Sequence, residues 1–138
     1  MQGDDRWRRL FIGALALLLA SYSFAPAHAV APFKREFEAV YVSHLDGSNT
    51  SARLVRAVQA AQCNVCHVKG KTKEALNAYG QALDRLLDHE RDKQDRAKIR
   101  SALAIVDQMQ IDPTDRKSIT FGQRLASGLL PDPAGAPQ

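Results

Sequence analysis

The stretch that decides the fold is NTSARLVRAVQAAQCNVCH, residues 49–67, in which a helical pattern runs straight into two cysteines and a histidine. Apolar residues recur there at the spacing of one helix face, namely Leu54, Val58 and Ala61. Thr50 or Ser51 is expected to cap the first turn, because a short hydroxyl side chain accepts a hydrogen bond from an otherwise unpaired amide. The stretch therefore predicts a helix that ends just before Cys63.

The same helical period recurs outside this stretch, and no convincing alternation of apolar and polar residues predicts a strand. Further helices are expected at 33–41, from about Thr72 to Leu87, at 99–109, and behind a capping box of Thr120 and Gln123. The charged run 90–98 is expected to be the solvated start of the helix that follows it. Asp112-Pro113 is expected to stop that helix, because a residue before proline disfavours helical geometry. The sequence thus predicts an all-α domain over residues 30–131, with a loose Pro/Gly-rich tail at 132–138.

The first 29 residues have the pattern of a secretory signal peptide. Three arginines precede an apolar run over residues 10–20, and the small-residue triplet Ala27-His28-Ala29 offers a cleavage site after Ala29. That run is short for a bilayer span of about 20 residues. A weaker uncharged stretch continues to Ala31, so an uncleaved anchor is the alternative. The expected location is the periplasm or another extracytoplasmic compartment, with membrane contact only if the segment is retained.

Length and composition exclude several classes of protein. With 138 residues the chain holds one small domain, and such a domain often needs covalent or metal-centred support. A net charge of +4 and an aromatic content of 7% do not fit a nucleic-acid-binding surface. Only two cysteines are present, which excludes a four-cysteine zinc site and a framework of several disulfides.

Cys63-Asn64-Val65-Cys66-His67 has the pattern C-x-x-C-H, which is the attachment signal for haem c. In that chemistry the two thiols add to the haem vinyl groups as thioethers, and the adjacent histidine supplies the proximal iron ligand. Three other uses of the cysteines compete with this interpretation. A zinc site needs a further ligand pair that the sequence lacks, a thioredoxin-like pair favours a preceding strand, and a disulfide leaves His67 unexplained. The predicted cofactor is therefore one covalent haem c, held by Cys63, Cys66 and His67.

Around this motif the chain resembles a small exported monohaem c-type cytochrome, of a kind seen in planctomycete-type bacteria. The segments that carry the resemblance are CNVCHVKGKTKEALNAYGQAL at 63–83 and TFGQRLASGLLP at 120–131. The resemblance implies a cytochrome c-like domain of about four to five short helices around one covalent haem. It also implies a one-electron carrier that is not an enzyme and that exchanges electrons with redox protein partners.

The sixth iron ligand is the open point of this interpretation. Met109 is the candidate, since thioether sulfur is a common axial ligand and Met109 lies far enough along the chain to fold over the opposite haem face. Alternatively it only continues the apolar stripe of its helix. His44 and His89 are expected to be exposed. If the sixth position is open, the protein would instead bind a small gas or reduce peroxide, and a third alternative is a haem subunit of a larger complex.

Three further features near the motif have two interpretations each. Gly80 either permits close approach of its helix to the haem or another segment, or is a tolerated helix glycine. Tyr79 either binds a haem propionate or packs in the core. The lysines at 69, 71 and 73 either steer an acidic partner to an exposed haem edge or form a solvated loop. Because the domain is small, we also expect the haem to supply much of its apolar centre.

Overall fold

The structure is a computed structural model that describes residues 32–44 and 46–133. The expected signal peptide at 1–29 and the end of the expected tail, from residue 134, lie outside the described residues. No helix within the described ranges is long and apolar enough to cross a membrane.

The described part of the chain is all-α, which confirms the expected class. It contains α2 (Pro32–Tyr41), α3 (Asn49–Ala61), the 3₁₀ turn η1 (Gln62–Val65), α4 (Ala78–Asp84), α5 (Arg96–Asp107) and α6 (Phe121–Ala126). In these residues extended pairing is limited to two isolated bridges, His67 with Leu76 and Gln110 with Thr120. Each bridge closes a loop between helices, so no sheet forms.

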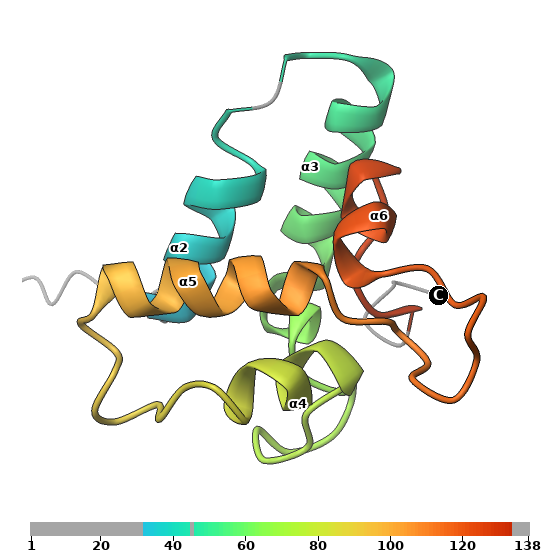
Figure 1. The fold of residues 1–138 in the computed structure, drawn as a ribbon. Coiled ribbons are helices and arrows are strands. Elements are labelled where there is room, and N and C mark those ends of the chain that lie inside the picture. Colours follow the sequence, from blue (N-terminus) through green and yellow to red (C-terminus); the bar gives the residue numbers. More distant parts are fainter. Residues whose placement is uncertain (1–31, 45, 134–138) are drawn as a thin grey trace, which may run out of the picture.

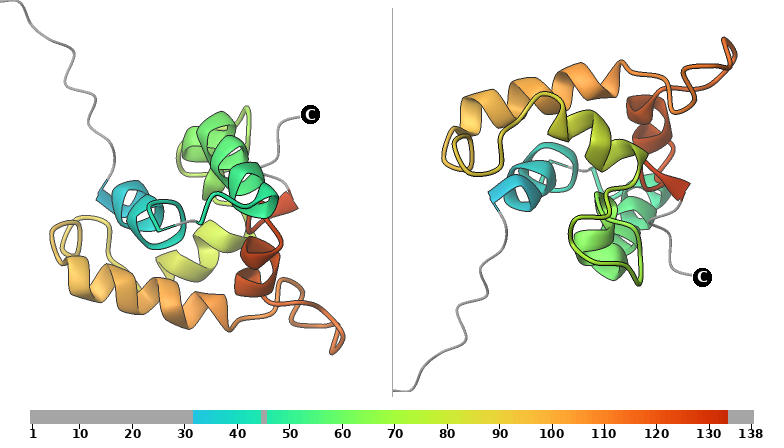
Figure 2. Two further views of the ribbon diagram at one scale, coloured as in Figure 1. Left: turned by 90° about the horizontal axis from the view of Figure 1, so that it is seen from above. Right: turned by 90° about the horizontal axis from the view of Figure 1, so that it is seen from below.

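Helix α5 organises the fold (Figure 1). In Figure 1 it crosses in front of α2 and lies above α4, and it contacts α2, α4 and α6, while α3 continues directly into η1 (Figures 1 and 2). The α2–α5 contact includes a buried carboxylate, since Glu36 accepts hydrogen bonds from Arg96 (2.6 Å) and Arg100 (2.7 Å). Those bonds hold the pKa of Glu36 below its usual value, although burial of the carboxyl acts in the opposite direction.

The centre of the domain is filled by side chains of the chain itself. Tyr79 of α4 is completely buried, and its ring contacts those of Phe37 and Phe121 edge-on, with centroids 5.9 and 5.3 Å apart. The buried cluster around it draws on every helix from α2 to α6. The described residues thus form an aromatic cluster of their own, and the expectation that haem supplies much of the apolar centre stays a prediction.

Several helix boundaries differ from the sequence-based expectation. Helix α4 ends at Asp84 rather than Leu87, and α5 ends at Asp107, before Asp112-Pro113. The third helix begins at Ala78 rather than near Thr72, because residues 67–76 close a loop through the hydrogen bond from Val68 N–H to the Ala75 carbonyl (2.8 Å). Only residues 96–98 of the charged run are helical, because α5 starts at Arg96, behind the cap Asp95. Helix α3 is capped by Ser48 rather than Thr50 or Ser51.

The C-terminal boundary also extends further than expected. The capping box of Thr120 and Gln123 on α6 is confirmed. Asp132, expected to open the loose tail, is buried, and its carboxylate accepts a hydrogen bond from Ala78 N–H at the start of α4 (2.7 Å). The packed domain therefore includes Asp132.

Candidate functional site

The C-x-x-C-H residues lie on a tight turn at the end of α3. Gln62 leaves the helix with a positive φ of 52°. The chain then curls so that the amides of Cys66 (3.2 Å) and His67 (3.1 Å) both donate to the carbonyl of Cys63. Residues 62–67, hereafter the motif turn, thus place Cys63, Cys66 and His67 on one backbone turn.

Gly80 lets α4 pack directly on the motif turn. A Cβ atom at Gly80 would lie 2.0 Å from the carbonyl oxygen of Cys66. No real carbon–oxygen contact is that short, so only glycine permits this approach. Of the two interpretations of Gly80, the structure supports close approach to another segment of the chain.

The two cysteines differ in environment. Both are free thiols, with Cys63 exposed and Cys66 half-buried against the core. Burial, with a smaller effect of Cys63, raises the pKa of the Cys66 thiol to about 12. A reactive thiol of the thioredoxin type needs a lowered pKa, and a helix rather than a strand leads into this motif. Cys66 therefore does not fit the redox-exchange role of a thioredoxin-type thiol.

His67 is half-buried, and its Nδ1 atom is buried without a hydrogen-bond partner. An unpaired buried polar atom costs about 1–3 kcal/mol, and neutral imidazole is the commonest metal ligand among protein side chains. Across the residues that the structure describes, no three His, Cys, Asp or Glu side chains gather as a zinc site requires. Two free thiols beside one imidazole are instead the donor set of haem c, so the residues present fit that group.

Met109 lies just beyond the end of α5. Its amide donates to the Val106 carbonyl (2.9 Å), and its own carbonyl accepts from Phe121 N–H (3.0 Å). The side chain is partly buried and packs against the core cluster. The structure thus places Met109 in the apolar packing, and its role as the sixth ligand stays a prediction.

The remaining candidates are on the surface. The side chain of His89 is 78% exposed, and His44 is exposed after the end of α2, both as expected. The three lysines of the loop at residues 68–74, hereafter the basic loop, are all exposed. This loop connects the motif turn to α4, so its charges lie close to the cysteines along the chain.

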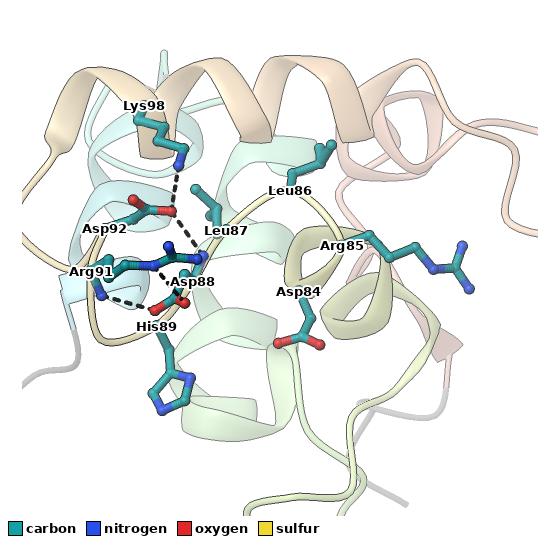
Figure 3. A pocket seen from close by; sticks show the side chains of 9 residues that line it. All are labelled: Asp84, Arg85, Leu86, Leu87, Asp88, His89, Arg91, Asp92 and Lys98. Carbon is teal, nitrogen blue, oxygen red and sulfur yellow. Dashed lines mark hydrogen bonds and ion pairs between the residues drawn. The ribbon is translucent and has the colours of Figure 1, made fainter.

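A shallow hollow between α4 and the start of α5 lies apart from the motif turn (Figure 3). Its polar groups are already paired: Asp92 accepts from Lys98 (2.6 Å), and Asp88 accepts from Arg91 (2.9 Å). His89 points away from the other lining side chains (Figure 3). The carboxylates of Asp88 and Asp92 are thus engaged within the hollow itself.

Sequence reasoning missed two groups of polar residues around the site. Asn77 is buried between the motif turn and α4; its one sequence signal is that asparagine often caps a helix that begins at the next residue. The second group is Tyr41, whose hydroxyl donates to the Asp107 carboxylate (2.8 Å), beside the buried hydroxyl of Tyr79. Burial raises the pKa of Tyr79 well above its usual value, so this hydroxyl stays neutral. No sequence signal marks Tyr41 or Asp107 as partners near Tyr79.

Comparison with protein-family models, with curated proteins and with solved structures finds no match for this chain. The functional argument therefore depends on the residues of the motif turn and their surroundings.

Proposed function

We propose that this protein is an exported monohaem c-type cytochrome that carries one electron between redox partners. The observation that carries the proposal is the motif turn itself. It presents one exposed thiol, one half-buried thiol and a half-buried imidazole within five residues, in the order C-x-x-C-H. The signal-peptide pattern and the attachment motif are independent of each other, and both support an extracytoplasmic location.

In this proposal each residue of the motif has a defined role. The sulfurs of Cys63 and Cys66 hold the haem through thioether bonds, and the imidazole of His67 is the proximal ligand. The bound haem supplies reversible one-electron redox chemistry. Two helices hold the motif turn in place, because α3 leads into the turn and α4 packs against the turn at Gly80. The exposed basic loop next to it is suited to an acidic partner.

A haem protein with an open sixth position is the second candidate. The packing of Met109 among core residues favours it, since that side chain already has partners in the domain. In this case the ferrous protein binds a small gas directly. Carbon monoxide binding to the reduced protein separates the two candidates, because a sixth protein ligand slows or blocks it.

The test of the main proposal is covalent attachment. The full chain is expressed in a host that exports it and attaches haem c, and the product is run on denaturing electrophoresis with haem staining. Wild type is expected to retain haem on the chain, and the double variant with Cys63→Ser and Cys66→Ser is expected to lose it. Haem that leaves the wild-type chain on acid-acetone extraction contradicts the proposal. Ser127→Ala, at an exposed position at the end of α6, is a control that should retain haem.

A further inference from the structure

Among the described residues, the Asn77 side chain makes the most hydrogen bonds to the backbone of the motif turn. It is 3% exposed and lies immediately before α4. Its side-chain amide Nδ2 donates to the carbonyls of Val65 (3.0 Å) and Asn64 (3.3 Å). Its backbone N–H donates to the carbonyl of Cys66 (3.0 Å). One residue thus satisfies three consecutive carbonyls of the C-x-x-C-H segment.

The same side chain also fastens α4. The Oδ1 atom of Asn77 accepts a hydrogen bond from Gly80 N–H (2.9 Å), which caps the helix. Gly80 in turn is the residue whose missing Cβ allows α4 to approach the Cys66 carbonyl. Asn77 therefore links the motif turn to α4: its Nδ2 donates to the turn, and its Oδ1 accepts from the helix.

These contacts do not involve a cofactor. In a short 3₁₀ turn such as η1, several carbonyls have no hydrogen-bond partner within the turn. A buried carbonyl without a partner lowers the stability of the fold. Asn77 provides the partners from within the chain, while Asp132 braces the next amide, that of Ala78 (2.7 Å). The geometry of the turn is consequently fixed by the protein alone.

We propose that Asn77 is the positioning residue of the haem site, holding the motif turn in its binding geometry before and without haem. The inference rests on the proposed function for its purpose, but the contacts that it invokes exist without the cofactor. By fixing the backbone from Asn64 to Cys66, Asn77 fixes the positions of the Cα atoms that carry the Cys66 and His67 side chains. It acts through these residues and does not itself touch the iron.

The chain permits a variant that separates this role from helix capping. Asn77→Asp and Asn77→Ser both keep an oxygen that can accept from Gly80 N–H, so α4 keeps its cap. Both lose the N–H group that donates to Val65 and Asn64, and the aspartate adds repulsion against two carbonyl oxygens. Asp95→Ala is the matched control, because it removes the cap of α5 away from the motif turn.

The first measurement is amide hydrogen exchange on the full chain made without haem. The amides of Cys66 and His67 report the turn, since both donate to the Cys63 carbonyl. Two lost hydrogen bonds of about 1 kcal/mol each correspond to at least about a tenfold faster exchange. This acceleration is expected in Asn77→Asp and Asn77→Ser, with the Leu103 amide of α5 changed less than twofold. Asp95→Ala is expected to give the reverse pattern.

The second measurement uses the haem-loaded chain. In Asn77→Ser the spectrum is expected to lose its histidine-ligated form at a lower urea concentration than in wild type, before the circular dichroism of the helices changes. The inference is overturned if the Cys66 and His67 amides exchange as in wild type, if all amides accelerate equally, or if the haem-free wild type gives them no protection. Absence of haem on the wild-type chain instead refutes the proposed function, so the two failures are distinct.

Discussion

The contact between Gly80 and the motif turn makes a quantitative prediction. In Gly80→Ala the new Cβ lies 2.0 Å from the Cys66 carbonyl oxygen, whereas real contacts stay above 3.0 Å, so the two segments must separate by about 1 Å. Both atoms belong to backbone or to Cβ, so no flexible side chain can move aside to relieve the contact.

The magnitude follows from three contributions. Overpacking of this kind costs about 2 kcal/mol. Separation also weakens the bonds of Asn77 to Cys66 (3.0 Å) and Val65 (3.0 Å), at about 1 kcal/mol each. Alanine returns about 1 kcal/mol through its higher helix propensity. The free energy of unfolding is therefore expected to fall by about 3 kcal/mol, which for a domain of this size lowers the Tm by roughly 15 °C.

The assay is unfolding in urea, monitored by circular dichroism, with wild type and variants prepared in the same way. Gly122→Ala is the matched control, since its Cβ would lie 2.9 Å from the Asp107 carbonyl oxygen, close to the limit that real contacts keep. It receives the same propensity gain and is expected to lose less stability than Gly80→Ala. A Gly80→Ala protein that is as stable as wild type, or more stable, refutes the packing argument.

Two further predictions concern Met109 and Glu36. Met109→Ala distinguishes a ligand role from a packing role. If Met109 is a ligand, the variant should lose the far-red sulfur–iron band of the oxidised protein and bind carbon monoxide rapidly. If Met109 only packs, the spectrum should stay unchanged and the free energy of unfolding should fall by about 2–3 kcal/mol. Glu36 has a pKa lowered in the folded state by Arg100 and Arg96, so its contribution is present above the unfolded pKa near 4.5 and is lost as the pH falls. Urea midpoints of wild type and Glu36→Gln should therefore differ at pH 7 and converge toward pH 3, and a difference that is constant with pH contradicts the role of this carboxylate.

Some structural features are visible in the sequence because they depend on neighbours along the chain. The apolar spacing of Leu54, Val58 and Ala61 reflects a local period, and the structure buries all three on α3. The capping box of Thr120 and Gln123 depends on atoms three residues apart, and it forms as expected. The C-x-x-C-H spacing likewise brings its three chemical groups onto one turn.

Other features depend on where helices meet, which a local pattern does not contain. Apolar residues from 76 to 87 suggest one long helix, yet the loop from His67 to Leu76 closes through backbone bonds and delays the helix to Ala78. The central aromatic cluster is a second case, since Tyr79 packs between Phe37 and Phe121, each of which lies 42 residues from it in the sequence and on a different helix.

The candidate site shows the same division. The sequence by itself determined the thiols, the imidazole, the helical class and the lead-in helix, because these follow from residue type and spacing within one segment. Only the tertiary structure decided that Asn77 holds three carbonyls of the motif turn and that Gly80 admits α4 against Cys66. Those contacts join residues more than ten positions apart, and hydrogen-bond geometry at that separation depends on the packed positions of two helices rather than on any spacing in the chain.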